Sequence, residues 1–105
     1  MNELKTFSSA QLSEAMESNE VLVVLASTPI CGTCAVAKKM LSVVSVMLAD
    51  VLIVDINLNY HEDLAVSEEI MSVPCILIYK KSVCVEKIYA FTSVPYLYQK
   101  IKDYL

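Results

Sequence analysis

The reactive side chains of this chain are concentrated in one segment, Cys31-Gly32-Thr33-Cys34. Before it, residues 21–26 form a continuous apolar run rich in β-branched side chains, which predicts a buried strand. After it, residues 35–48 contain no glycine or proline and predict a long helix. The first thiol would then lie at a helix N-terminus, where free backbone N–H groups and the helix dipole stabilise a thiolate. The second would lie one turn further along, within reach of any disulfide that the first one forms. This layout predicts a dithiol–disulfide switch.

A metal site and a structural disulfide are the other interpretations of the cysteine pair. A closed zinc site needs four ligands, usually completed by a second cysteine pair or by two histidines. Cys75 and Cys84 are too far apart in the sequence to form such a pair, and His61 is the only histidine. A disulfide across so short a loop would constrain the unfolded chain little. The flanking strand and helix therefore favour the redox interpretation.

Length and charge restrict the classes of protein to consider. The 105 residues, 56% of them hydrophobic, predict a single domain over residues 1–105. The net charge is −4 and every basic residue is a lysine. Without arginine there is no bidentate recognition of phosphate or guanine, so we expect no nucleic-acid partner. The acidic balance and the short apolar runs predict no membrane association. Residues 1–5 lack the features of a secretory signal, which predicts a cytoplasmic protein whose paired cysteines are catalytic.

The apolar patterns and turn signals predict the element order β-α-β-α-β-α-β-β-α. The expected strands are residues 4–7, 21–26, 51–56, 75–79 and 83–89. A right-handed crossover would make strands 21–26 and 51–56 parallel, with helices on both faces of the sheet. A turn at residues 80–82 would make the last two strands an antiparallel hairpin. The fold class is therefore α/β, with a central mixed β-sheet.

Capping residues and apolar stripes define the expected helices. Ser8 and Gln11 have the spacing of a capping box, and Asn59 is the expected N-cap of the third helix. Ser93 is the expected N-cap of the last helix, with Pro95 in its first turn. The expected inner face of the long helix is Val36, Met40, Val43, Val44 and Met47, and that of the last helix is Leu97, Ile101, Tyr104 and Leu105.

With these elements in place, the chain resembles the thioredoxin family. The resemblance rests on the Cys31–Cys34 motif after a buried strand, on Ser72-Val73-Pro74 before a later strand, and on the element order over essentially all 105 residues. It implies the thioredoxin fold. It also implies that the Val73-Pro74 bond is cis, that Pro74 packs against the cysteines, and that the Val73 backbone pairs with a bound polypeptide.

The resemblance assigns roles within the active-site loop. Cys31 would be the nucleophile that attacks a substrate disulfide, and Cys34 would resolve the mixed disulfide by attacking Cys31. Gly32 would allow close backbone approach, and Thr33 would offer a hydroxyl in the first turn. The two cysteines carry the electrons, so no cofactor is expected.

The expected partners are protein disulfides and an electron donor of the thioredoxin-reductase kind, both implied by the resemblance. Substrates would be held against Ile30, Cys31 and the Val73-Pro74 segment. The function expected on this basis is that of a thioredoxin-like protein-disulfide oxidoreductase.

Several positions depart from the family pattern. Ile30 replaces the usual tryptophan, Thr33 the usual proline between the cysteines, Lys39 the proline that kinks the long helix, and Leu25 a buried carboxylate associated with proton transfer to the second cysteine. Asp55 stands where the family often has lysine, and it could supply the carboxylate that is missing near Cys34. The alternative, favoured by the cost of burying an ionised carboxylate, is that Asp55 ends its strand and faces solvent.

Three further residues could carry chemistry, but simpler roles are expected. Cys75 should begin a strand near the active site as a small buried hydrophobic residue. A Cys75–Cys84 disulfide is not expected, because the predicted turn sets Tyr79 nearly opposite Cys84. His61, at a predicted helix start beside two acidic residues, is expected to be solvated at the surface.

Two alternatives from other functional classes remain open. One is a thioredoxin-fold binding module with vestigial cysteines, whose apolar surfaces dock a partner. The other is an intermolecular metal or cluster site, to which Cys31 and Cys34 of two chains contribute.

Overall fold

The computed structural model describes residues 4–89 and 93–105. The elements follow in the order β1 (Lys5–Thr6), α1 (Ser9–Ser18), β2 (Val21–Ser27), α2 (Gly32–Met47), β3 (Leu52–Asn57), a 3-10 helix η1 (Leu58–Tyr60), α3 (Glu62–Ser67), β4 (Cys75–Lys80), β5 (Val83–Ile88) and α4 (Val94–Lys102). This order confirms the predicted one, with η1 as an addition before α3.

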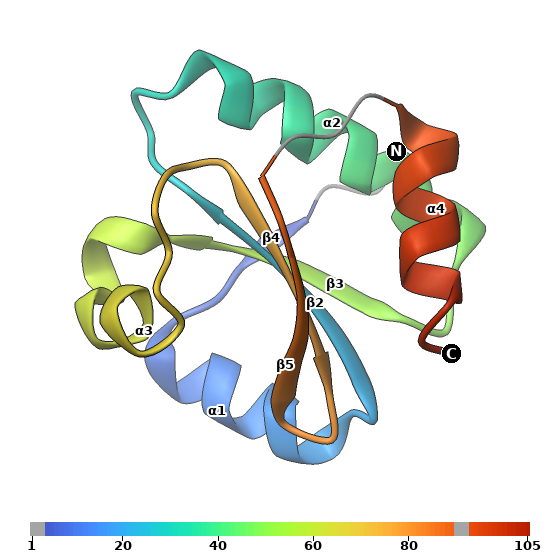
Figure 1. The fold of residues 1–105 in the computed structure, drawn as a ribbon, viewed down its shortest axis with the longest axis horizontal. Coiled ribbons are helices and arrows are strands. Elements are labelled where there is room, and N and C mark those ends of the chain that lie inside the picture. Colours follow the sequence, from blue (N-terminus) through green and yellow to red (C-terminus); the bar gives the residue numbers. More distant parts are fainter. Residues whose placement is uncertain (1–3, 90–92) are drawn as a thin grey trace.

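The strands form one mixed sheet in the order β1-β3-β2-β4-β5 (Figure 1). β2 runs parallel to β3, with Leu25 opposite Asp55, and antiparallel to β4, with Ala26 opposite Cys75. The predicted α/β fold with a mixed sheet is therefore confirmed. This topology also places the end of β2, which leads into the cysteine motif, beside the start of β4 and the segment before it.

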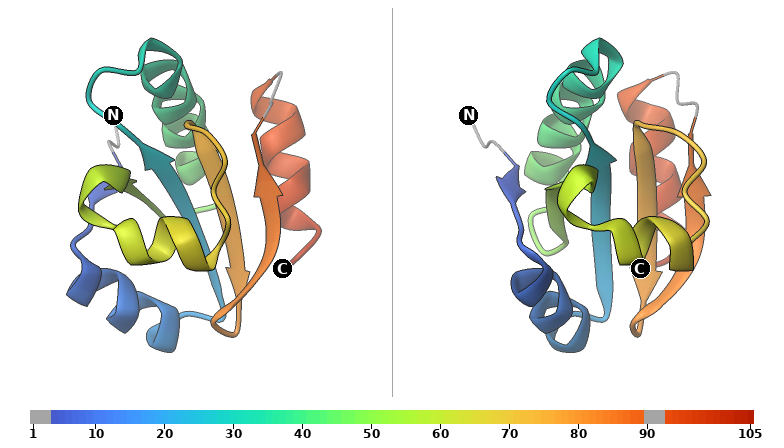
Figure 2. Two further views of the ribbon diagram at one scale, coloured as in Figure 1. Left: turned by 60° about the vertical axis from the view of Figure 1, so that its left-hand side comes forward. Right: turned by 90° about the vertical axis from the view of Figure 1, so that its left-hand side faces the viewer.

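Helices cover both faces of the sheet, with α2 and α4 on one face and α1 and α3 on the other (Figure 2). Each face has its own apolar core. Val23 and Leu25 point into the core under α2 and α4, whereas Leu22 and Val24 point into the core under α1. Successive side chains of a strand alternate between faces, so β2, in the centre of the sheet, is buried throughout. That double burial explains its uninterrupted apolar sequence.

The capping predictions hold at two helices and fail at a third. Ser8 and Gln11 form the predicted capping box of α1, and the Ser93 side chain accepts a hydrogen bond from the Tyr96 N–H at α4. Asn59 is not the N-cap of α3, because it lies inside η1, where its N–H donates to the Asn57 side chain at 3.1 Å. The α-helix begins only at Glu62.

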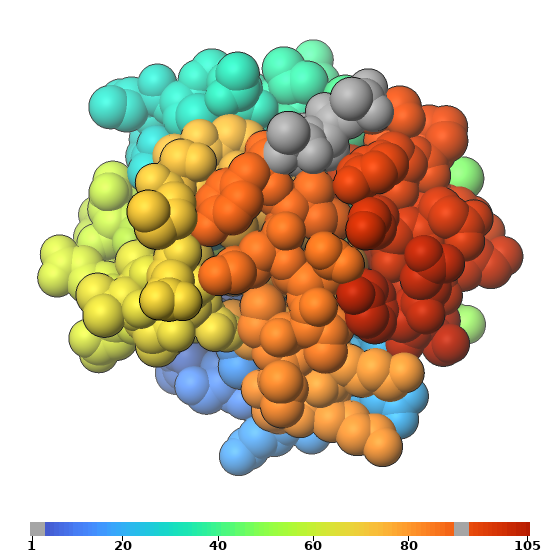
Figure 3. Space-filling view, viewed as in Figure 1, coloured from blue at the N-terminus to red at the C-terminus, as the bar shows by residue number. Residues whose placement is uncertain are grey.

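The predicted inner face of α2 is largely wrong. Val44 is buried and Met40 packs partly against the core, but Val36, Val43 and Met47 are about half exposed. The helix instead buries Cys34, Ala37, Leu41 and Val44. It begins at Gly32, and with Cys34 turned inward the 3.6-residue period carries the buried stripe through these positions. Val36, Val43, Val46 and Met47 thereby form an apolar strip on the outer side of α2. The helix itself lies along the upper rim of the molecule in Figure 3.

The inner face of α4 is confirmed at Leu97 and Ile101, which are fully buried, and is wrong at Leu105, which is exposed. Tyr104 packs partly against the core, and its hydroxyl donates a hydrogen bond of 2.8 Å to a Glu86 carboxylate oxygen.

Within the described residues, no helix is long and apolar enough to span a bilayer.

The β4–β5 hairpin has the predicted register, with Tyr79 opposite Cys84. Its turn residues, Lys81 and Ser82, both have positive φ, at 52° and 67°. Two-residue hairpin turns of type I′ require positive φ at both positions, a conformation that is unfavourable for residues other than glycine, asparagine and aspartate. Two contacts with the neighbouring segments hold the turn: the Lys81 N–H donates to the Glu20 carbonyl at 2.8 Å, and the Ser82 hydroxyl donates to the Met16 carbonyl at 2.9 Å.

Candidate active site

Cys31 is the N-cap residue of α2, as the sequence predicts for the first thiol. The turn after β2 leads into it, and its N–H donates to the Thr28 carbonyl at 3.3 Å. The Cys31 sulfur in turn accepts a hydrogen bond of 3.3 Å from the Cys34 N–H, and it lies 3.2 Å from the Thr33 hydroxyl oxygen. A thiol in this position satisfies one of the free N–H groups of the helix end.

These contacts favour the thiolate form of Cys31. Hydrogen bonds from the Cys34 thiol and from the Thr33 hydroxyl lower the pKa of Cys31 below its ordinary value of 9.0. The side chain is only partly buried. Cys31 therefore combines access with thiolate character, the two properties that make a thiol reactive.

Cys34 has the opposite properties. It is 3% exposed, and burial, together with its hydrogen bond to Cys31, raises its pKa to about 11. A hydrogen bond to the Thr28 backbone and, to a smaller extent, the charge of Lys38 act in the other direction and lower the pKa of Cys34. Both cysteines are free, and their thiols are close enough to hydrogen-bond each other. The loop thus holds Cys31, which is accessible and has a lowered pKa, next to Cys34, which is buried and has a raised pKa. When two paired groups differ in pKa in this way, they can take different roles in a reaction.

The segment before β4 lies beside this loop. The Val73-Pro74 peptide bond is cis, as predicted, and Pro74 is buried while Val73 is partly exposed. The pairing of Ala26 with Cys75 brings Pro74 next to the end of β2. Ile30, directly before Cys31, is 96% exposed. Apolar side chains that solvent can reach therefore border the reactive thiol.

Asp55 does not face solvent, so the expectation of an exposed strand end is wrong. Its side chain is 3% exposed, and its Oδ2 atom lies 2.7 Å from the Lys38 Nζ atom. The Lys38 ammonium is therefore the group that compensates the burial of that oxygen. A paired carboxylate can be buried where an unpaired one cannot. Sequence reasoning missed Lys38, although its position four residues after Cys34 places both side chains on one side of α2.

A groove of about 1090 Å³ runs along α2 from the cysteines. Its polar end contains Cys31, Cys34, Lys38 and Asp55, and its other end contains Val43, Val46 and Met47 from the outer strip of α2. The Lys38–Asp55 pair and the resolving thiol therefore share one solvent-connected space.

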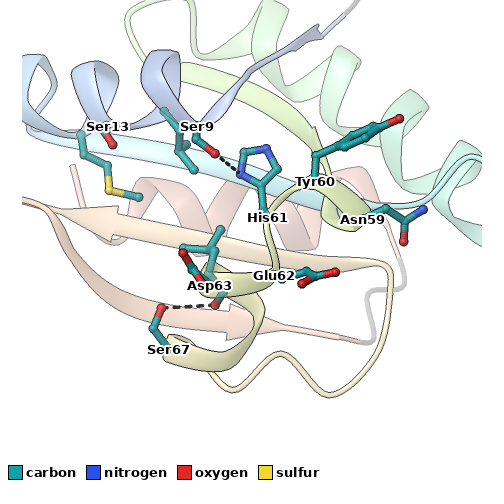
Figure 4. Close-up of a pocket in the computed structure, with 11 residues that line it drawn as sticks. Ser9, Ser13, Asn59, Tyr60, His61, Glu62, Asp63 and Ser67 are labelled. Atoms are coloured by element: carbon teal, nitrogen blue, oxygen red, sulfur yellow. Dashed lines mark hydrogen bonds between the residues drawn. The ribbon is translucent and has the colours of Figure 1, made fainter.

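His61 is buried, contrary to the prediction of surface solvation. It is 5% exposed and lines a separate hollow of about 620 Å³ between α1 and the η1–α3 segment (Figure 4). Its Nε2 atom lies 3.3 Å from the Phe7 carbonyl oxygen, which can only accept, so Nε2 carries the hydrogen. Its Nδ1 atom faces the Ser9 hydroxyl at 3.5 Å. His61 thus links α3 to the start of α1, a long-range contact with no signal in the local sequence.

Cys75 and Cys84 lie apart, as predicted. Cys75 is fully buried, and burial raises its pKa to about 11. Cys84 faces Tyr79, four positions further along β4, which corresponds to roughly 13 Å at the strand rise. A disulfide requires Cα atoms within about 7 Å. Among the described residues, no group of three or more His, Cys, Asp or Glu side chains could hold a metal ion.

Comparisons with known proteins agree with this geometry. The family model described as Thioredoxin matches residues 3–103. The chain is 48% identical over 85 residues to thioredoxin-like protein YusE of Bacillus subtilis (strain 168). These 85 residues cover 81% of this chain and 80% of that protein.

Solved structures give the same fold at lower sequence identity. A mutant thioredoxin from Halobacterium salinarum NRC-1 superposes with a TM-score of 0.86 at 17% identity, covering 97% of this chain and 90% of that one. The oxidised thioredoxin from Plasmodium falciparum superposes with a TM-score of 0.84 at 20% identity, covering 96% of this chain and 97% of that one.

Proposed function

Because this chain belongs to the thioredoxin family, we propose that residues 1–105 form a single thioredoxin-like domain that reduces or exchanges protein disulfides. One observation carries the proposal, the division of labour between Cys31 and Cys34. The first thiol is accessible and has a lowered pKa, and the second is buried with a raised pKa. A nucleophile and a resolving thiol need these opposite properties.

In the proposed reaction, the Cys31 thiolate attacks one sulfur of a substrate disulfide. The substrate S–S bond breaks, a mixed disulfide forms, and the other substrate sulfur leaves as a thiolate that takes up a proton. Cys34 then loses its proton and attacks the Cys31 sulfur. The Cys31–Cys34 disulfide forms, and the substrate leaves with both sulfurs reduced. Two electrons pass from the cysteine pair to the substrate, and a donor of the thioredoxin-reductase type would restore the dithiol.

We propose that the substrate chain lies across Ile30 and the Val73-Pro74 segment. The exposure of Ile30 and the position of Val73 beside the cysteine loop support this. Gly32 is the chain's one glycine, yet a Cβ atom built on it meets nothing within 4 Å. The protein's own packing does not require glycine there. The open space in front of its backbone supports close approach by a substrate.

Asp55 is the proposed proton-transfer group for Cys34. Its carboxylate is buried in the groove that Cys34 also lines, on the strand next to Leu25. The test compares the pH–rate profiles of the wild type and Asp55→Asn. A changed profile supports the role, and superimposable profiles refute it.

The proposed setting follows from the proposed chemistry. A dithiol that reduces other proteins must itself stay reduced, which suits the cytoplasm. The cysteine pair carries the electrons, so the reaction as proposed uses no bound cofactor. The proposed partners are proteins rather than nucleic acid or membrane, in keeping with the net charge of −4 and the absence of arginine.

The outer strip of α2 favours a second candidate, a binding module. Val36, Val43, Val46 and Met47 are each about half exposed, although their types suit a core. In this alternative the strip docks a partner and the cysteines do not turn over. An intermolecular metal site at the cysteines is tested separately, by metal analysis of the purified protein.

The deciding experiment measures reduction of a disulfide-bonded protein in the presence of a dithiol donor. The wild type is compared with Cys31→Ser and with Cys84→Ser, a matched control that removes a thiol on the β5 edge strand. Oxidoreductase function requires catalysed turnover by the wild type and by Cys84→Ser, and none by Cys31→Ser. Equal, uncatalysed rates for all three would leave the binding module as the better account.

A further inference from the structure

Cys34 and Lys38 lie one helical turn apart on α2. They are four residues apart in one helix, which places their side chains on the same side, with Cβ atoms roughly 6 Å apart. Both residues line the groove, and Lys38 remains partly open to solvent, with 45% of its side chain exposed. Because the lysine side chain is long and flexible, its position depends on what holds the ammonium.

Asp55 supplies that hold. Its carboxylate is fixed on β3, which is paired on both sides, and its Oδ2 atom lies 2.7 Å from the Lys38 Nζ atom. A buried carboxylate has a strong requirement for a counter-charge, so the ion pair keeps the ammonium inside the groove. The same contact places a positive charge next to the helix turn that carries Cys34.

We propose that Lys38, held in place by Asp55, is the cation that stabilises the Cys34 thiolate during resolution of the mixed disulfide. Asp55 then acts as a positioning residue in addition to any role as a proton acceptor. This inference rests on the function proposed above and adds an electrostatic partner for its second step. The resolving thiol is the one that needs such help, because a thiolate forming in a buried position loses the stabilisation that water would provide.

The other charges around Cys34 agree with this role. The titratable and charged groups that line the groove are Cys31, Cys34, Lys38, Lys39 and Asp55. During resolution Cys31 is bonded to the substrate and carries no charge. Asp55 alone would oppose ionisation of Cys34, since like charges repel. Lys38 is therefore the charged side chain that favours the thiolate. Together with a hydrogen bond to the Thr28 backbone, which has the larger effect, it lowers the pKa of Cys34 against the effect of burial.

The test observes the resolving step alone, with a small aromatic disulfide whose released thiolate is coloured. Cys31 attacks the reagent and releases the first thiolate, leaving a mixed disulfide. Cys34 then attacks Cys31, closing the Cys31–Cys34 disulfide and releasing the second thiolate. The reagent is the oxidant, and Cys34 loses one proton to the buffer. The second phase, followed against pH, reports the ionisation of Cys34, and the first phase is an internal control for folding.

The variants are Lys38→Met, Lys38→Arg and Lys39→Met. Lys38→Met should slow the second phase at neutral pH by about three- to ten-fold and move its pH profile upward, as expected for loss of a nearby charge. Lys38→Arg should restore the wild-type profile. Lys39→Met is the matched control, because it makes the same charge change one position along the helix. The rate of its second phase should stay within about two-fold of the wild-type rate.

A double-mutant cycle tests the role of Asp55. If Asp55 holds the ammonium in place, Lys38→Met should have little further effect once Asp55→Asn is present. An unchanged second phase in Lys38→Met, or equal slowing by Lys39→Met, overturns the inference while leaving the oxidoreductase proposal intact. No second phase in the wild type refutes the oxidoreductase proposal itself.

Discussion

Alkylation of the folded, reduced protein should be strongly selective for one of its four cysteines. The perturbation is brief treatment with iodoacetamide near pH 8, under conditions that leave the protein folded. Iodoacetamide reacts with thiolates and hardly at all with thiols, so the rate at each cysteine follows the ionised fraction and the access to the sulfur. Cys31 has the lowered pKa and is partly exposed, whereas Cys34 and Cys75 are buried. Cys84 is also partly exposed, but burial raises its pKa.

The pKa values set a minimum for the selectivity. With a pKa of about 11, Cys34 and Cys75 are ionised in roughly one molecule in a thousand at this pH. Cys31, whose pKa lies below 9.0, is ionised in at least about one molecule in ten. Cys31 should therefore react at least about a hundred times faster than Cys34 or Cys75, and burial of those two sulfurs should widen the difference further.

The assay quenches the reaction at intervals and locates the label by peptide fragmentation, which separates Cys31 from Cys34 within one peptide. Repeating the labelling in denaturant provides the control, because all four cysteines should then react at similar rates. Equal labelling of Cys31 and Cys34 in the folded protein, or faster labelling of Cys34, would refute the assignment of nucleophile and resolving thiol.

Four further predictions concern single substitutions. Thr33→Val removes the hydroxyl that lies 3.2 Å from the Cys31 sulfur, and alkylation of that thiol should slow by about two- to five-fold near pH 8. Gly32→Ala meets no steric obstacle, so the free energy of unfolding should rise by about 0.5 kcal/mol in denaturant titrations, while reduction of a protein disulfide should slow more than that of a small disulfide. Burial raises the pKa of Cys75 from 9.0 to about 11, so its protonated thiol favours the folded state below pH 9, and this stabilisation is lost as the pH rises through 11. Between neutral pH and pH 10, the free energy of unfolding of the wild type should therefore fall by about 1.4 kcal/mol relative to that of Cys75→Ala. Lys81→Asn should raise the thermal midpoint through a gain of about 1 kcal/mol, because asparagine tolerates a φ of 52° better than lysine, and a neutral or negative effect would argue against the turn conformation.

The sequence was most informative where local chemistry and fold agree. The apolar run of β2 predicts a strand that is buried on both faces, and it lies in the centre of the sheet. The Ser8–Gln11 box fixes the start of α1 through neighbours in the chain. The cysteine motif sets its own helix end, because the Cys31 sulfur caps α2. Each of these features is decided within a few residues.

The features that sequence reasoning missed depend on contacts between distant segments. The burial of Asp55 requires Lys38 from α2, and neither residue predicts the other. His61 is buried because Ser9 and the Phe7 carbonyl lie across from its ring. The predicted inner face of α2 rests on apolar residue types alone. The face that is actually buried is set by the inward position of Cys34 in the first turn, which the apolar residues do not reveal.

The central claim is that Cys31 and Cys34 form a working dithiol–disulfide couple. Its most direct test is a redox titration against buffers of defined dithiol-to-disulfide ratio, with free thiols trapped by alkylation and counted by mass. Cys31→Ser is the control. We expect a single two-electron transition in which the wild type loses both trapped thiols together and the variant shows no transition. A wild-type protein in which Cys31 and Cys34 stay reduced across the whole range would contradict the account.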